Sequence, residues 1–257
     1  MSRFINLEFG DLSEGRCEPE ETVKDESYYL SEAQQHFENG CFEPALRAYA
    51  RVLEHNPQNP AAWAGQVRML IELGEAHEAS LWCDKALERF PQEADLLAAK
   101  AVALARIGEL DDALGFSDAS FEGSGDSAYL WLARAEVLLA RKERRAAFCF
   151  ERSGQVANHT WVTQWMASRL RLAYRQPALA LQHARSAMEL GPTVFLVWLQ
   201  LGLCQQALGM VTPAGTSFTR ALELNPDCLE AQRALKLTQQ MDAWTQLRLW
   251  LRRLLSS

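Results

Sequence analysis

Histidine and cysteine are the residues of this chain that could ligate a metal or act as nucleophiles, and their spacing argues against both roles. The histidines are His36, His55, His77, His159 and His183, and the cysteines are Cys17, Cys41, Cys83, Cys149, Cys204 and Cys228. No histidine has a cysteine or a second histidine at the short spacing of metal ligands, and no C-x-x-C pair occurs. We therefore predict that the chain has no metal site.

Motifs for other chemistry are also missing from the sequence. It contains no phosphate-binding G-x-x-x-x-G-K-[ST], no dinucleotide-binding G-x-G-x-x-G after a strand, no H-E-x-x-H and no G-x-S-x-G. The stretch EGSGDS at 122–127 lacks the lysine of a phosphate loop. Asp111 and Asp112 begin a helical run, where carboxylates complement the helix dipole. We expect no enzyme and no cofactor.

The composition is that of an acidic globular protein. The 257 residues are 48% hydrophobic and carry a net charge of −7, of which −5 falls in the first 26 residues. No basic stripe is evident, which disfavours nucleic-acid binding. Scattered cysteines favour a reducing compartment, and neither a secretion signal nor an apolar run of membrane-spanning length is present. We expect a cytoplasmic protein that is not integral to a membrane.

Four prolines reveal an internal repeat. Pro57, Pro91, Pro192 and Pro226 each follow a helical run, and they are separated by 34, 101 and 34 residues. Because 101 is three steps of 34 less one residue, the spacing predicts six units from residue 26 to residue 228. Each proline then marks the boundary between two helix pairs, since proline cannot continue a helix.

The sixth unit shows what one repeat contains. Its first helical run carries Trp198, Leu201 and Gly202, and Gly209 ends that run. Its second run carries Ala214, Phe218 and Ala221 on one helix face and ends before Pro226. This pattern resembles the tetratricopeptide repeat. The second unit matches it with Trp63, Gly74, Ala79, Ala86 and Pro91, whereas the fourth and fifth are degenerate and Arg175 replaces the expected glycine.

The resemblance covers about four fifths of the chain and implies a fold. It predicts an all-α, right-handed α–α superhelix of about six helix pairs in one domain, followed by C-terminal capping helices. We therefore divide the chain into an acidic, disordered segment 1–25, six repeats in 26–228, and a capping helix with an amphipathic C-terminal helix in 229–257. Small residues at helix crossings let backbones approach closely, while larger side chains fill the gaps beside them.

In the tetratricopeptide family, the first helix of each pair lines a concave groove that usually binds peptides. The matching inward positions here are Leu30, Gln34, Ala64, Arg68, Ala98, Val102, Tyr129, Leu132, Glu136, Leu139, Trp165, Arg169, Leu199 and Leu203. This set is mostly apolar and suits an extended or helical segment with aliphatic anchors. The Lys/Asn/Arg clamp by which some relatives hold an acidic chaperone C-terminus is absent, and only Arg68 and Arg106 could meet a carboxylate.

Two alternatives remain open for these positions. The apolar side chains could fill the space between tightly curved neighbouring helices, or the N-terminal segment could cover them. The C-terminal helix has alternatives as well. Its apolar stripe, Trp244, Leu247, Trp250, Leu251 and Leu254, could pack on the end of the array, form a partner or oligomer interface, or lie on a membrane surface.

The leading functional hypothesis is a non-enzymatic adaptor, or a chaperone-like protein, that binds an apolar segment of another protein in its groove. The alternative is a structural scaffold subunit that assembles through the C-terminal amphipathic helix. Both hypotheses predict a protein partner and no nucleic acid.

Overall fold

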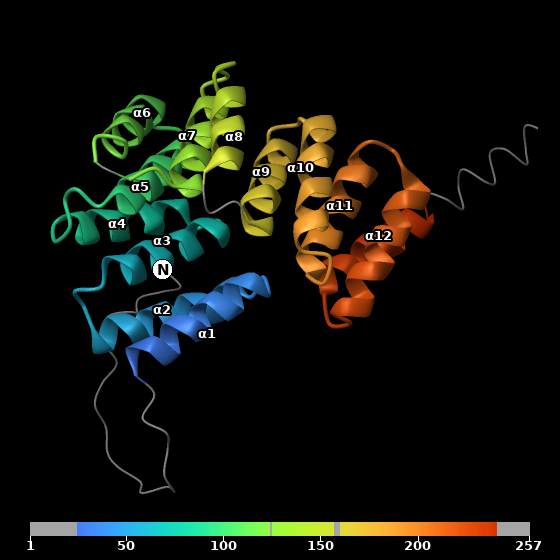
Figure 1. Cartoon of the computed structure of the whole chain (residues 1–257), viewed down its shortest axis with the longest axis horizontal. Coiled ribbons are helices and arrows are strands. Elements are labelled where there is room, and N and C mark those ends of the chain that lie inside the picture. Colours follow the sequence, from blue (N-terminus) through green and yellow to red (C-terminus); the bar gives the residue numbers. More distant parts are fainter. Residues whose placement is uncertain (1–24, 124, 157–159, 241–257) are drawn as a thin grey trace, which may run out of the picture. The chain divides into compact units, whose positions relative to one another are not determined.

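The computed structural model describes residues 25–123, 125–156 and 160–240, and every regular element within these ranges is a helix (Figure 1). The chain divides into two compact units, Met1–Gly125 and Asp126–Ser257. The first unit contains α1 (Glu26–Glu38), α2 (Phe42–His55), α3 (Pro60–Glu72), α4 (Ala76–Leu87), α5 (Ala94–Ile107) and α6 (Leu110–Ala119). The second contains α7 (Ala128–Ala140), α8 (Ala146–Gln155), α9 (Trp161–Ala173), α10 (Pro177–Leu190), α11 (Phe195–Ala207) and α12 (Val211–Leu224), followed by the helical stretch 229–240.

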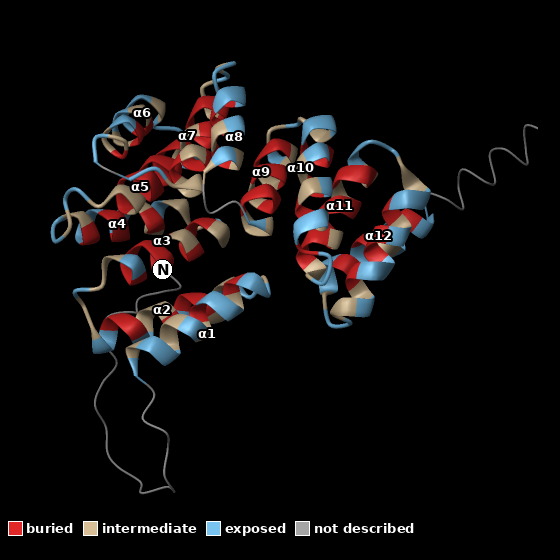
Figure 2. Cartoon of the chain, in the orientation of Figure 1, coloured by how far each residue is buried: buried red, intermediate tan, exposed pale blue. Residues whose placement is uncertain are grey.

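The helices pack as consecutive pairs within each unit. Each odd-numbered helix contacts the even-numbered helix that follows it, and the first helices of neighbouring pairs also touch, as in α3 with α5 and α9 with α11. Figure 2 shows buried residues on the helix faces that meet, with exposed residues on the outer faces. The predicted all-α array of six helix pairs is confirmed in residues 26–224.

The turn inside each pair needs a residue in the left-handed region. Glycine supplies it in four pairs, with φ of 66° at Gly40, 84° at Gly74, 105° at Gly108 and 72° at Gly209. The fourth and fifth pairs place Lys142 (φ 60°) and Arg175 (φ 57°) there instead. The glycine missing from the degenerate repeats therefore does not change the turn, although a side chain is strained in this conformation.

The boundaries between pairs repeat one hydrogen bond. Nε1 of Trp63 donates to the carbonyl oxygen of Pro57 over 3.0 Å, and Nε1 of Trp198 donates to that of Pro192 over 2.8 Å. In each case the donor lies six residues after the proline. Gln232 takes the same place after Pro226, and its Nε2 donates over 2.7 Å. These bonds fix where the first helix of the next pair begins.

Side-chain caps add to this at three helix starts. Asp25 accepts from the backbone N–H of Tyr28 at the start of α1, and Asn59 accepts from Ala62 at the start of α3. Ser127 does the same for α7. Each oxygen satisfies an N–H group that the helix itself leaves without a partner.

Alanine lies at the closest crossings between paired helices. Ala79, Ala113, Ala180, Ala214 and Ala221 are fully buried. Phe218 fills the space beside Ala214 and Ala221 and is fully buried with them. Small residues at the crossings and an aromatic ring between them account for the repeated spacing in the sequence.

Two predicted segments lie outside the described residues. They are the acidic segment up to residue 24 and the C-terminal helix with Trp244, Leu247, Trp250, Leu251 and Leu254. Their assignment, like the division of the chain at residues 25 and 228, remains a prediction.

Candidate protein-binding surface

The predicted groove positions of the first unit come from α1, α3 and α5, and they differ in accessibility. Gln34 is exposed, and Leu30 and Arg68 are half-buried. The others are small and buried, namely Ala64, Ala98 and Val102. They belong to helices with long buried runs, since every residue of α5 from Leu96 to Ala105 is buried. This unit therefore offers little apolar surface at the predicted positions.

The predicted positions of the second unit come from α7, α9 and α11, helices that contact one another in that order. Five of the side chains are buried, namely Leu132, Glu136, Leu139, Trp165 and Leu199. Tyr129 on α7, Arg169 on α9 and Leu203 on α11 are half-buried. At the predicted positions, each first helix of this unit thus contributes one partly accessible side chain.

Burial decides which of the predicted groove positions can be substituted to test partner binding. Leu132 is 2% exposed, and Leu199 is 5% exposed within a core cluster that includes Ala214 and Phe218. An aspartate at either leucine would disrupt packing and so could not report on partner binding alone. The accessible positions Arg169 and Leu203 are the ones to substitute. Membership of the buried positions in a groove remains a prediction.

Two tryptophan rings and an arginine follow one another along α9 at the predicted groove register. The guanidinium carbon of Arg169 lies 4.7 Å from the ring centre of Trp165, and the rings of Trp165 and Trp161 lie 6.1 Å apart. These residues are four apart and therefore share one helix face. The ring of Trp161 also packs closely against the backbone of Gly191, where an added Cβ atom would come within 2.9 Å of the ring. Arg169 is therefore positioned beside two packed indole rings.

A polar face of α9 anchors this helix to its neighbours. Gln164 and Nδ1 of His183 on α10 are joined by a hydrogen bond of 2.8 Å. The hydroxyl of Ser168 accepts from Nε2 of Gln200 on α11 over 3.0 Å. Burial, with a smaller contribution from the charge of Arg171, lowers the pKa of His183 to about 4. The imidazole is therefore neutral at physiological pH and serves packing.

Arg171 completes the polar face of α9. It is 7% exposed, and its guanidinium carbon lies 4.0 Å from the ring centre of Phe150 on α8. Nη1 donates to Oε1 of Gln176 over 2.6 Å, while Nε has no hydrogen-bond partner among the described residues. Burial lowers the pKa of this guanidinium, which links α8, α9 and the turn before α10.

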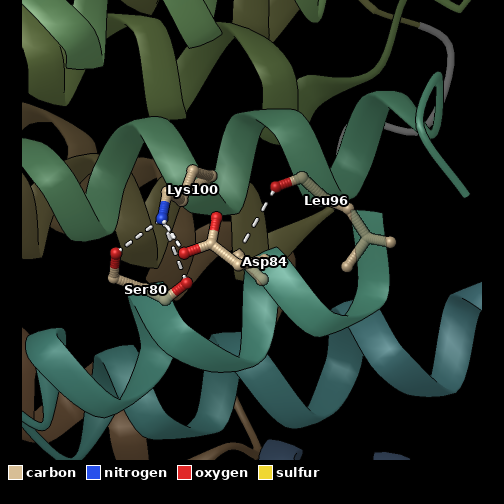
Figure 3. Close-up of polar contacts among 5 residues, drawn as sticks. Ser80, Asp84, Leu96 and Lys100 are labelled. Carbon is tan, nitrogen blue, oxygen red and sulfur yellow. Dashed lines mark hydrogen bonds and ion pairs between the residues drawn. The ribbon is translucent and has the colours of Figure 1, made fainter. Parts of the chain in front are cut away.

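The first unit has a comparable internal link (Figure 3). Nζ of Lys100 on α5 donates to the carbonyl oxygen of Ser80 over 3.1 Å and to its hydroxyl over 2.7 Å. It also pairs with Oδ2 of Asp84 at 2.8 Å. Next to this link, burial raises the pKa of the Cys83 thiol to about 12, which removes it as a nucleophile. The cluster joins α4 to α5.

The two arginines that could meet a carboxylate have structural partners. Nη1 of Arg106 donates to the carbonyl oxygen of Ile71 over 2.6 Å, at the C-terminal end of α3 where a cation is favourable. The guanidinium carbon of Arg68 lies 5.9 Å from the ring centre of Phe37. The absence of a carboxylate clamp remains a prediction from the sequence.

Metal-binding clusters and membrane-spanning helices are absent from the described residues. No group of three or more His, Cys, Asp or Glu side chains there could hold a metal ion. No helix in the described part of the chain has both the length and the apolarity needed to cross a membrane. The cysteines Cys41, Cys83, Cys149, Cys204 and Cys228 are free thiols.

Comparison with known proteins identifies the repeat. A family model described as tetratricopeptide repeat matches residues 30–94. Residues 30–94 therefore match the tetratricopeptide repeat, and the rest of the chain is similar to it in fold. No sequence among the curated proteins matches it. The fold suits protein–protein interaction or a scaffold role.

Solved structures support the same fold. A tetratricopeptide repeat protein from Parabacteroides merdae is 16% identical, with a TM-score of 0.55 over 85% of this chain and 86% of that chain. A thermophilic tetratricopeptide repeat protein from Thermus thermophilus is 18% identical, with a TM-score of 0.52 over 84% of this chain and 99% of that chain. The human IFIT1 dimer with m7Gppp-AAAA is 16% identical, with a TM-score of 0.55 over 86% of this chain and 57% of that chain.

Sequence reasoning missed residues that the structure brings together. Lys100 is a charged side chain within the otherwise apolar run of α5, and that was the available signal. Arg171 lies among other polar residues of α9, so its sequence context gave no such signal. Phe148 and Arg152 lie four residues apart on α8, a spacing that predicts a shared face. Their contact with Trp131 on another helix could not be inferred from spacing.

Proposed function

We propose that this tetratricopeptide repeat protein is a non-enzymatic adaptor that binds an extended or helical apolar segment of another protein. The surface we assign to this role is the accessible edge of α7, α9 and α11 in the second unit, with Tyr129, Arg169 and Leu203 as contact residues. The Trp165–Arg169 stack is the observation that supports it most strongly. A chaperone that shields such a segment would use the same residues.

The physical argument concerns preorganisation. Aromatic and arginine side chains dominate the energetics of protein interfaces, because they combine a large contact area with directed hydrogen bonds. Trp165 is packed from two sides and holds Arg169 in place, so binding orders fewer side chains. Leu203 on the adjoining helix α11 supplies an apolar contact for the same segment.

The test compares two matched double variants of the full chain. Arg169→Glu with Leu203→Asp changes the proposed surface, whereas Arg185→Glu with Leu179→Asp makes the same changes on exposed positions of α10. Proteins captured from native cell extract by each form are quantified by mass spectrometry. We expect the first variant to lose a partner that the wild type and the second variant retain.

Thermal unfolding followed by circular dichroism serves as the control for folding. If Leu203→Asp lowers the melting temperature markedly, the capture experiment uses Arg169→Glu alone. The Arg169 side chain is only half-buried, so its substitution should disturb the fold less. Retention of every captured protein by Arg169→Glu would contradict the proposed surface.

A scaffold role remains the second candidate. The last described helical stretch, 229–240, carries two strongly exposed leucines, Leu229 at 61% and Leu237 at 56%. The sequence stripe Trp244, Leu247, Trp250, Leu251 and Leu254 follows directly. Light scattering of the full chain and of a Leu247→Asp/Leu251→Asp variant tests this role. An oligomer that becomes monomeric in the variant supports a scaffold, and a monomer in both cases contradicts assembly through this segment.

A further inference from the structure

The outer face of α8 carries an exposed aromatic side chain between two arginines. Phe148 is 56% exposed, and Arg145 and Arg152 flank it three residues before and four residues after. The hydrogen bond from the backbone N–H of Phe148 to the carbonyl oxygen of Arg145 makes that stretch a tight helical turn, so the three side chains share one face. We call these three residues the α8 outer face.

A second helix holds the aromatic part of this face in position. Phe148 meets the ring of Trp131 on α7 edge-on at 5.8 Å, and the guanidinium carbon of Arg152 lies 5.5 Å from the same indole. Asp126 accepts a hydrogen bond from Nε1 of Trp131 and pairs with Arg152 at 3.4 Å. The surface is therefore organised before any partner arrives, although Phe148 remains largely in water.

Charge sets this region apart from the rest of the protein. Residues 141–152 contain five cations and two acids, a net charge of +3, in a chain whose total is −7. Glu143 lies between Arg145 and Arg141, and hydrogen bonds from these two arginines hold the pKa of its carboxyl below the usual range. One carboxylate thus serves two guanidinium groups, and Lys142 and Arg144 add exposed positive charge.

We propose that the α8 outer face binds an acidic linear segment of another protein with the pattern acid–x–apolar–x–acid. The charge of the partner follows from the cations, and the central apolar residue follows from Phe148. The spacing follows from helix geometry, because Phe148 lies about 6 Å along the axis from each arginine. Two residues of an extended peptide span about 6.6 Å, so its acids would meet Arg145 and Arg152.

This site is separate from the proposed groove in both position and chemistry. It uses the outer face of a second helix, whereas the groove uses the first helices of the pairs. It selects acidic segments by charge, whereas the groove selects apolar ones. A single partner could occupy both, but neither proposal requires the other.

The experiment measures binding of a fluorescent peptide to the full chain by anisotropy. The probe has the sequence GSEALAESG, and the control GSEELAASG has the same composition with adjacent acids. We expect the control to bind at least about fivefold more weakly, because only one of its acids can reach an arginine. Raising the salt concentration from about 50 to about 300 mM should weaken binding of the probe further, since exposed charges are screened.

Two variants of the chain sharpen the test. Phe148→Ala removes the exposed aromatic side chain and should reduce affinity for the probe about tenfold, as truncation of an interface aromatic does. Leu179→Ala removes an exposed apolar side chain of α10 and should leave affinity unchanged. Unchanged binding to Phe148→Ala, or equal binding of the two peptides, would overturn the proposal.

Two further outcomes would reassign the site. Tight binding of a uridine octamer that Phe148→Ala abolishes, without binding of the acidic probe, would make this face a nucleic-acid surface. If Arg169→Glu no longer binds the probe and Phe148→Ala still binds it, the peptide lies in the groove. The groove proposal is tested by a different measurement, the set of proteins captured from cell extract. Its failure can therefore be distinguished from either of these results.

Discussion

The ring of Phe218 on α12 occupies the place where a Cβ atom on Gly202 of α11 would lie. A Cβ built on Gly202 comes within 2.5 Å of Cε1 of Phe218, closer than such atoms approach one another in proteins. Phe218 is fully buried, so its ring cannot move out of the way without disturbing its neighbours. This contact sets the closeness of the two helices in the sixth pair.

We predict that Gly202→Ala lowers the free energy of unfolding of the second unit. Overpacking costs about 1–3 kcal/mol and outweighs the gain of about 1 kcal/mol from better helix propensity. Gly215→Ala on α12 is the matched control, because its new Cβ meets only Cγ2 of Thr238 at 3.9 Å. That control should be neutral or stabilising by up to about 1 kcal/mol in chemical denaturation. Equal effects of the two substitutions would contradict the close contact.

A stabilising substitution is expected at Arg175. Its φ of 57° is unfavourable for a side chain, and the residue is exposed. Arg175→Gly should raise the free energy of unfolding by about 0.5–1 kcal/mol, net of the entropy that glycine adds to the unfolded chain. Gly74→Ala, at the equivalent turn with φ of 84°, should be destabilising by a similar amount. Urea titration of both variants measures the two effects.

His183 makes the stability of the second unit depend on pH. Its folded pKa of about 4 lies below the ordinary value of 6.5, so the unfolded chain binds the proton more readily between these values. The stability contribution is therefore present above about pH 6.5 and is lost as the pH falls toward 4, up to about 3 kcal/mol. Denaturation midpoints from about pH 7 to about pH 4.5 should fall in the wild type and change less in His183→Gln. Parallel profiles would exclude His183 as the cause.

The Lys100 link predicts an order of destabilisation in the first unit. Lys100→Ala removes a buried stem and the hydrogen bonds of its ammonium group and should cost about 2–4 kcal/mol. Asp84→Ala should cost about 1 kcal/mol, because its side chain is 56% exposed and water can replace it. The exposed control Arg47→Ala breaks only a surface pair with Glu43 and should cost less than about 0.5 kcal/mol. A larger loss for Asp84→Ala than for Lys100→Ala would contradict this order.

The sequence by itself indicated where the first, second, fifth and sixth helix pairs end. The signals are the boundary prolines and the turn glycines, for example Pro57, Pro192 and Pro226. They act through local backbone geometry, which depends on the residue type at one position. The same local logic explains why the fourth and fifth pairs were harder to recognise, since Lys142 and Arg175 adopt the turn conformation without the residue that signals it.

Only the tertiary structure decided which side chains a partner could reach. The resemblance to the tetratricopeptide repeat implied inward positions for Leu132, Leu199, Arg169 and Leu203, yet the first two are buried and the last two are partly accessible. Accessibility depends on how closely neighbouring helices pack, which is a property of residues distant in sequence. The contact of Phe148 with Trp131, and the charges gathered around it, depend on the same packing.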